Sequence, residues 1–377
     1  VGFHPWEYSS TDHYFREVDT TTFDLRAISN DHSALFDGKT QWVVGLFAKD
    51  SEQDLRREYT FADGVFTSLY EPSNQALYVQ TDTQLTEHFV LRAGLRLDNF
   101  QIDYTDVTGF TSNTDDTMLG GRLVLDYQID NTTSYAGVSR GCKAGGFNPD
   151  ERVTSQNRIF DPEFNWNYEL GVKGRFTGAD AFIRMAVFYM DREDTQVSDF
   201  DVQIRDDGSA DFIDVIGNAD TGTNWGVEIE TSWQVNDALL LTASFGFLDA
   251  TFSDYQLANG YVVGKQEQAQ SPKRTFSAAA QFLLTEQLVW RVEVDGKDDF
   301  RFSDGHNERS PSYELVNTRL SYEMEDWSLS LWVKNLLDET YFVRGFGGFS
   351  NDPRDFYEFP EPYYQLGDGR QAGITLD

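Results

Sequence analysis

The side chains that most often carry out chemistry are present in this sequence, but not in the spacings that known reactions require. The five histidines are His4, His13, His32, His88 and His306. They form no HxxxH or HExxH pair, so the sequence predicts no zinc site. No GxSxG nucleophile motif occurs. Lys143 with Gly145 and Gly146 lacks the GxxxxGK(S/T) spacing of a phosphate loop, and the glycines are more typical of a bent strand end. We predict neither an enzyme nor a resident metal or cofactor.

A group of aromatic residues and arginines near the end of the chain has the chemistry to bind a flat ligand. Arg344 and Arg354 lie between residues 341 and 364 among many rings. The rings are Tyr341, Phe342, Phe346, Phe349, Phe356, Tyr357, Phe359, Tyr363 and Tyr364. Rings and guanidinium groups together can hold a flat, anionic chelate by stacking and charge. The alternative, which the sequence favours, is an aromatic girdle at a membrane interface with loop packing.

Composition narrows the class of protein further. The chain has 377 residues and a formal net charge of -33, a surface that phosphate backbones would repel, so we predict no nucleic-acid partner. With 40% hydrophobic and 15% aromatic residues, disorder is the poorer interpretation. The single cysteine, Cys142, permits no intrachain disulfide. No apolar run approaches the roughly 18 residues of a membrane-spanning helix.

The elements that would position these groups are strands, because hydrophobic residues recur with a period of two. From Trp225 to Val235 the odd residues are mostly apolar, whereas the even residues include Glu228 and Glu230. Strands of about ten residues, apolar on one face and charged on the other, suit a wide barrel with lipid outside and water inside. We therefore predict an all-β fold, an antiparallel transmembrane β-barrel.

Turn and loop lengths alternate in the manner of an outer-membrane barrel. Short polar turns are expected at residues 37–41, 85–88, 129–133, 177–180, 235–238, 285–287 and 323–326. Long polar segments lie between them, at residues 101–116, 143–161, 192–220, 251–272, 298–311 and 342–369. Seven turns predict about fourteen strands, and the C-terminal segment adds a fifteenth. Single-chain barrels of bacteria have even strand numbers, so we expect a partial barrel, with residues 1–22 as the tail of a loop.

Charged residues on the strands are expected to face the aqueous interior. They are Arg92, Arg96, Arg122, Glu169, Lys173, Arg175, Glu228, Glu230, Arg291 and Glu293. We interpret these residues as cross-strand ion pairs in a solvated interior. The alternative is a polar wall that meets an internal plug or guides a ligand. The acidic residues 192–214 predict a solvated external loop. Calcium binding, or bridging of outer-leaflet phosphates by divalent cations, is the alternative. It is disfavoured because the D-x-D-x-D-G pattern of a calcium loop is missing.

Six strings resemble strands of TonB-dependent receptors and occur in the expected order. They are FDLRAIS from Phe23, SRGCKAGGFN from Ser139, YELGVK from Tyr168, GVEIE from Gly226, SPKRTF from Ser271 and WSLSLWVKNLLDETYF from Trp327. The chain departs from the family pattern at two positions. It ends on Asp377 instead of an aromatic residue, and Cys142 stands where an aromatic residue usually precedes Lys143.

The resemblance implies a barrel of about 22 strands closed by an internal plug. Residues 1–377 would then be a partial barrel domain of about 15 strands, with the plug and the first strands missing. It implies an outer-membrane importer that is energised by the TonB complex through that plug and embedded in outer-membrane lipid. Its ligand would be a ferric siderophore, or another bulky solute such as cobalamin or an oligosaccharide. A passive pore or adhesive barrel and an outer-membrane enzyme are the rival functions.

The candidate ligand contacts are basic and aromatic residues of two loops. They are Arg140, Lys143, Phe147, Arg344, Phe346, Phe349 and Tyr357. Cations and rings at the external end of a barrel suit an anionic chelate.

Overall fold

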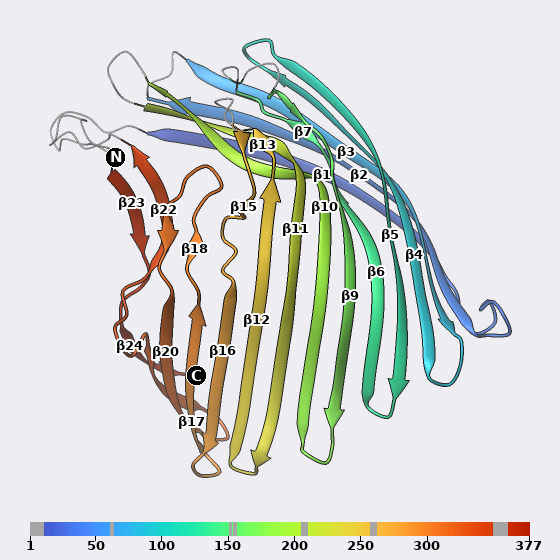
Figure 1. Ribbon diagram of the computed structural model, residues 1–377, viewed down its shortest axis with the longest axis vertical. Coiled ribbons are helices and arrows are strands. Elements are labelled where there is room, and N and C mark those ends of the chain that lie inside the picture. Colours follow the sequence, from blue (N-terminus) through green and yellow to red (C-terminus); the bar gives the residue numbers. More distant parts are fainter. Residues whose placement is uncertain are drawn as a thin grey trace.

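The computed structural model describes residues 11–60, 64–150, 153, 157–204, 210–256, 262–349 and 361–377. Sixteen of the described strands form one curved, open antiparallel sheet (Figure 1). Its strands are β1 (Asp12–Ile28), β2 (Thr40–Tyr59), β3 (Val65–Gln84), β4 (Phe89–Asp106), β5 (Thr111–Ile129), β6 (Thr132–Lys143), β9 (Glu163–Phe176), β10 (Ala181–Ile204), β11 (Ala210–Asn236), β12 (Leu239–Ser253), β15 (Gln266–Glu267), β16 (Arg274–Leu283), β17 (Leu288–Lys297), β20 (Tyr313–Glu323), β21 (Ser328–Lys334) and β24 (Gln371–Leu376). No helix in these ranges is long and apolar enough to cross a membrane.

Four small hairpins are formed by the loops between these strands. They are β7 (Gly146–Phe147) with β8 (Ile159–Phe160), β13 (Tyr255–Gln256) with β14 (Val262–Val263), β18 (Phe300–Arg301) with β19 (Arg309–Ser310), and β22 (Phe342–Phe349) with β23 (Glu361–Leu366). In Figure 1 these hairpins lie toward the end of the sheet opposite the short turns. We call this the loop end of the sheet.

The order of strands confirms the predicted all-β antiparallel architecture. Apart from the short β15, which pairs with β12, the path from β1 to β24 contains 15 strands in sequence order, each paired with the next. Short connections follow β3, β5, β9, β11, β16 and β20, as the turn residues predicted, and the connection after β1 is longer. Within the described residues, β1 pairs only with β2 and β24 only with β21, so the sheet is an open part of a barrel.

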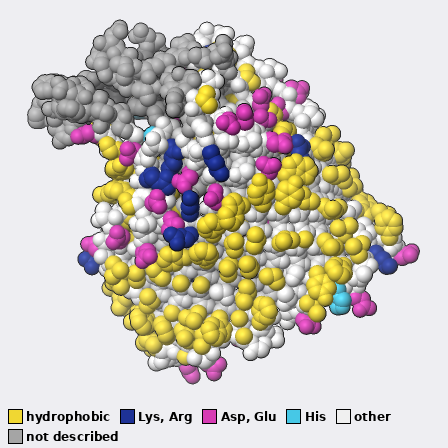
Figure 2. All heavy atoms as spheres, in the orientation of Figure 1, with side chains coloured by type: hydrophobic (Ala, Val, Ile, Leu, Met, Phe, Trp, Pro, Cys, Tyr) yellow, Lys and Arg dark blue, Asp and Glu magenta, His cyan; other side chains and the backbone are white. Residues whose placement is uncertain are grey.

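Cross-strand register brings the apolar residues of neighbouring strands into continuous outward-facing rows. Leu25, Leu46, Leu77, Leu97 and Leu119 are successive partners across β1 to β5. Their exposed fractions lie between 47% and 56%. Hydrophobic side chains gather in a broad band across the sheet (Figure 2). A band of this size, which water would disfavour, is the lipid-facing surface of a membrane barrel.

The opposite face carries the charges, as predicted. Arg96 forms an ion pair of 2.8 Å with Asp98, and Arg291 forms one of 2.7 Å with Glu293. Glu230 lies 3.0 Å from the guanidinium of Arg184 on the neighbouring strand. These pairs support the interpretation of a solvated interior with local ion pairs.

Three expectations about loops were wrong, for one physical reason. Residues 12–22 are not the tail of a loop, because they pair with residues 49–59 of β2. Most of segment 101–116 is strand in β4 and β5, and most of segment 192–220 is strand in β10 and β11. Strands β10 and β11 are 24 and 27 residues long, not about ten. Above the lipid-facing band neither face meets hydrocarbon, so these extensions lack the apolar alternation that marks a membrane strand.

Candidate ligand-binding mouth

An upper hairpin, residues 195–204 with 210–219, continues β10 and β11 at the loop end beyond a bend at Asp194. Asp194 has a φ of 52°, a left-handed conformation that interrupts the alternation of a strand. Glu193 pairs with Thr221 below it, and Thr195 pairs with Ala219 above it. Below Asp194 the odd-numbered residues of β10 and β11 face outward. Thr195 and Ala219 are also odd-numbered but are buried, so above Asp194 the odd-numbered side chains lie on the other face. Figure 1 shows the upper ends of β10 and β11 turning away from their lower parts.

Two small hydrophobic clusters form a dry core that includes residues of this upper hairpin. The first consists of Val197, Ala219, Phe252 and Tyr255, and the second of Val153, Ile213 and Val215. Within the described part of the chain, buried hydrophobic residues form these two clusters. The loop end is therefore packed like a small globular domain, whereas the wall of the sheet has lipid on one side and water on the other.

Phe147 belongs to a second feature of the mouth, an aromatic group on the inner face of β3 to β5. Its ring centroid lies 4.7 Å from that of Tyr104, 6.2 Å from Phe110 and 6.4 Å from Tyr70. The guanidinium of Arg158 lies 4.2 Å from the centre of the Phe110 ring. Burial raises the pKa of Tyr104 to about 12, so its hydroxyl stays neutral. We call these five residues the aromatic group.

The glycines before Phe147 let its loop approach the wall closely. The Gly145 amide donates a hydrogen bond of 2.9 Å to the Asp116 carboxylate. A Cβ at Gly145 would lie 2.6 Å from the Phe160 carbonyl, and one at Gly146 would lie 2.7 Å from the Phe160 ring. These glycines permit close approach of backbone, as the sequence predicted, and they carry no phosphate loop.

Lys143 and Arg140 lie on opposite faces of β6. Lys143 shares the inner face with its cross-strand partner Glu163, is exposed, and has no ion-pair partner among the described residues. Arg140 is in register with Trp166 on the lipid-facing side, and its guanidinium lies 4.1 Å from the centre of the Phe164 ring. Of the two cations, Lys143 is the one that faces the interior.

The remaining predicted contacts belong to β22 or lie beyond what can be described. Arg344 and Phe346 are exposed on one side of β22, while Gly345 on the other side packs against the ring of Phe302. The side chain of Phe349 and the whole of Tyr357 lie outside the described residues. Stacking of Phe342 on Tyr364, with ring centroids 4.6 Å apart, is part of the loop packing that the sequence favoured.

The predicted residues thus fall into two sets, Lys143 with Phe147 and Arg344 with Phe346. No hydrogen bond, ion pair or ring contact joins the two sets within the described residues. Sequence reasoning missed Tyr70, Tyr104, Phe110 and Arg158, which complete the aromatic group. They come from three separate segments, and only the SRGCKAGGFN string pointed to their meeting place.

Loop 298–312 places titratable groups in the packed part of the mouth. Burial raises the pKa of the Asp304 carboxyl, which accepts a hydrogen bond of 2.7 Å from the Ala269 amide. Burial lowers the pKa of His306. Arg301 donates to the His306 carbonyl at 2.7 Å.

In the described ranges, no three His, Cys, Asp or Glu residues are grouped as a metal site, and the acidic residues among 205–209 lie outside them.

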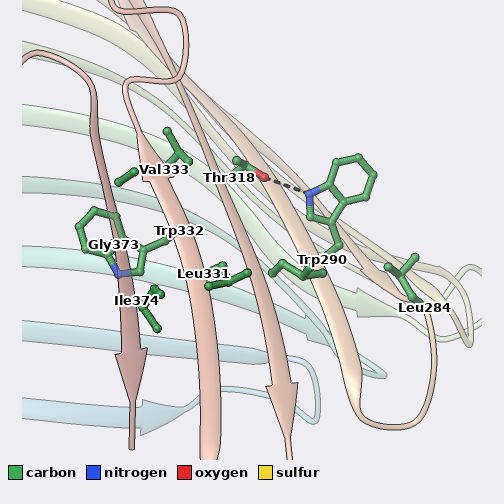
Figure 3. A pocket seen from close by; sticks show the side chains of 10 residues that line it. Leu284, Trp290, Thr318, Leu331, Trp332, Val333, Gly373 and Ile374 are labelled. Carbon is green, nitrogen blue, oxygen red and sulfur yellow. Dashed lines mark hydrogen bonds between the residues drawn. The ribbon is translucent and has the colours of Figure 1, made fainter.

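A separate apolar pocket lies on the lipid-facing wall near the C-terminal strands (Figure 3). It has a volume of about 690 Å³ and includes Leu331 and Ile374, which are cross-strand partners. The indole of Trp290 donates a hydrogen bond of 2.9 Å to the Thr318 hydroxyl at its edge. Since its outward residues face hydrocarbon, this pocket is not part of the mouth.

Fold and faces together define a membrane β-barrel wall with structured loops at one end. A family model, TonB dependent receptor-like, beta-barrel, matches residues 2–336, and the chain belongs to this family. The family comprises outer-membrane receptors and transporters, not enzymes. The predicted family, fold and outer-membrane location are confirmed.

Similar proteins are receptors and transporters of about twice the length. The pesticin receptor of Yersinia pestis is 23% identical over 331 residues, which are 83% of this chain and 47% of that protein. The crystal structure of the ferric yersiniabactin uptake receptor FyuA from Yersinia pestis has a TM-score of 0.75 and 20% identity, covering 98% of this chain and 55% of that one. The copper transporter OprC has a TM-score of 0.70 and 16% identity, covering 96% and 56%. The chain spans about half the length of these proteins.

Proposed function

We propose that this protein imports a ferric siderophore across the outer membrane. The observation that carries the proposal is the aromatic group with its arginine on the inner face of the mouth, in a chain of the TonB-dependent receptor family. Aromatic faces and a guanidinium favour a flat, anionic or aryl-bearing chelate. Relatives include the probable TonB-dependent siderophore receptor PiuA of Acinetobacter baumannii, 20% identical over 84% of this chain and 43% of that protein.

The proposed ligand contacts are Lys143 and Phe147 on one side of the mouth and Arg344 and Phe346 on the other. All four side chains are at least partly accessible, and the two cations have no described ion-pair partner. Phe349 and Tyr357 stay candidates of the same loop. Arg140 is the weakest candidate, because it lies on the lipid-facing side over Phe164.

Energy for import would come from the TonB complex, acting through a plug outside residues 1–377. We take residues 1–377 as one partial barrel domain. The alternative is a receptor for another bulky solute, such as cobalamin or an oligosaccharide, or a passive pore. The copper transporter among the similar structures shows that this fold is compatible with other cargo.

Uptake of radioactive iron by a deletion strain carrying the whole gene tests the proposal. Iron should be supplied as catecholate, hydroxamate and phenolate complexes in parallel, with and without a protonophore. We expect saturable, protonophore-sensitive uptake of one class, reduced by Phe147→Ala and Arg344→Ala. Arg56→Ala, which removes an outward arginine that is 55% exposed, is the matched control. Uptake that does not saturate and resists the protonophore would indicate a pore.

A further inference from the structure

Asn148 lies beneath the upper hairpin and is almost completely buried, with an exposed fraction of 3%. Its Oδ1 accepts a hydrogen bond of 2.9 Å from the Ile216 amide. Its Nδ2 donates to the Ile216 carbonyl at 2.8 Å and to the Asn157 carbonyl at 2.6 Å. One side chain therefore satisfies backbone groups of two segments that are far apart in sequence.

The two bonds to Ile216 replace a missing strand neighbour. On this side of β11 the ladder with β12 ends at the pair of Thr221 and Ser253, so Ile216 lies beyond it. An unpaired amide and carbonyl in a buried strand edge are costly. The Asn148 carboxamide offers one acceptor and one donor in the same plane, as a neighbouring strand would.

Neighbouring side chains reinforce this junction. The Asn218 Oδ1 accepts from the Asp161 amide at 2.8 Å, and its Nδ2 donates to the Asp161 carbonyl at 3.0 Å. Gln196 donates to the Ala144 carbonyl at 2.8 Å. The upper hairpin is thus attached to residues 144–148 and 157–161 by side-chain amides, above the bend at Asp194.

The same loop carries Phe147 and Arg158 of the aromatic group. Phe147 is the residue before Asn148, and Arg158 donates to the Asn148 carbonyl at 3.1 Å. Any movement of Asn148 would therefore move the Phe147 ring against Tyr104, and would release the edge of the hairpin at Ile216. One buried amide therefore links the orientation of the aromatic group to the position of the hairpin.

We propose that Asn148 is a positioning residue that joins the upper hairpin and the Phe147 loop into one rigid unit of the mouth. The inference rests on the proposed function only in taking Phe147 as a ligand contact. Asn148 itself does not meet the ligand. Without its amide, only side chains such as Asn218 and Gln196 would attach the hairpin to the loop, and the hairpin and Phe147 would no longer keep one relative position.

The requirement for both a donor and an acceptor distinguishes this role from simple packing. Asp has nearly the same shape, but an ionised carboxylate would face the carbonyls of Ile216 and Asn157 with no proton to donate. A protonated Asp regains one donor while its other oxygen accepts from the Ile216 amide. Burial and the two facing carbonyls raise the pKa of a carboxyl at position 148, whereas the positive charge of Arg158 opposes this shift. Asn148→Asp should therefore loosen the junction near neutral pH and restore it in acid.

Distances between spin labels on the whole protein in lipid vesicles test the proposal without any ligand. One label replaces exposed Pro149 on the loop and the other replaces exposed Asp214 on the hairpin, in a Cys142→Ser background. We expect one narrow distance population in the parent protein at both pH values. Asn148→Ala should lose that population, and Asn148→Asp should lose it near pH 8 and regain it near pH 5.

Asn113→Ala is the matched control, because its amide donates to the Asp103 carboxylate at 2.5 Å on the outer face, away from the junction. It should leave the narrow population intact. An unchanged distance distribution in Asn148→Ala, or no difference between the two pH values in Asn148→Asp, would overturn the proposal. Should Asn148→Ala not fold, the pH comparison within Asn148→Asp still decides. Failure of iron uptake would leave these distances unaffected, so the two proposals fail separately.

Discussion

The wall of the sheet and its loop end are held together by different forces. In the wall, leucines such as Leu97 are exposed to lipid on one face, and ion pairs such as Arg291 with Glu293 are exposed to water on the other. At the loop end, Ile213 has an exposed fraction of 1% and Glu163 one of 7%. A wall that has solvent on both sides tolerates changes that a dry core does not, provided that each face keeps its own polarity.

Breaking the buried ion pair of the mouth should have the largest effect. The Glu163 carboxylate lies 2.7 Å from Nε of Arg192 and accepts from the Gln196 amide at 2.8 Å. Glu163→Ala leaves the guanidinium buried without a partner, which should cost about 3 to 5 kcal/mol. Urea titration of the whole protein in vesicles, read at the loop end, measures the loss.

The wall offers the matched control for this pair. Glu230 pairs with Arg184 at 3.0 Å, but both side chains are more than half exposed. Glu230→Ala should cost less than about 0.5 kcal/mol. Equal losses at the two sites would contradict the distinction between mouth and wall.

A charge on the lipid-facing side should have the second largest effect. Ile229 lies between Met185 and Phe245 on the outer face, and the preceding residue, Glu228, lies on the inner face. Ile229→Arg should destabilise the folded barrel by about 2 to 4 kcal/mol, whereas Glu228→Arg should change it by less than about 0.5 kcal/mol. Refolding equilibria into vesicles measure both changes in folding free energy. A larger loss for Glu228→Arg than for Ile229→Arg would mean that the assignment of the two faces is wrong.

Removal of one methyl group should reduce stability more at the loop end than in the wall. Ile213→Val opens a small void in the buried cluster with Val153 and Val215 and should cost about 1 kcal/mol. Ile374→Val, at a residue that is 71% exposed on the outer face, should cost almost nothing, since lipid fills the space. Thermal unfolding of both variants measures the difference, which would vanish if the mouth were not a packed core.

The smallest expected effect is a pH dependence confined to the loop end. Burial lowers the pKa of His306 below its ordinary 6.5, against the nearby Glu308 carboxylate and with the help of Arg301. A depressed pKa stabilises the fold above the ordinary value, and this stability is lost as the pH falls through the folded value. The hydrogen-exchange protection factors of β18, β19 and β22, which remove the intrinsic pH dependence of amide exchange, should therefore fall on acidification from about pH 7.5 to about pH 5.5.

His306→Gln isolates this contribution from that of a neighbouring carboxyl. Burial raises the pKa of Asp304, so its contribution to stability has the opposite sign and is present at low pH. The substitution should remove the acid-induced fall in protection while Asp304 stays in place. A fall in protection of the same size in the variant would assign the effect to another group.

Sequence reasoning recovered the wall because its signal is local. Alternation at Trp225 to Val235 and the short turn at residues 85–88 each depend on adjacent residues and a single lipid face. The mouth depends on contacts between segments far apart, such as Tyr104 with Phe147 and Asn148 with Ile216. No period marks them, so residues 192–220 were expected to be a loop.

The central claim is that outward residues of the wall meet hydrocarbon and inward residues meet water. Spin labels at single cysteines through residues 225–233, in a Cys142→Ser background of the whole protein in vesicles, test it most directly. Collisions with oxygen should peak at Trp225, Val227 and Ile229, and collisions with a water-soluble nickel chelate should peak at Glu228 and Glu230. Equal accessibility along the segment, or the opposite phase, would contradict the account.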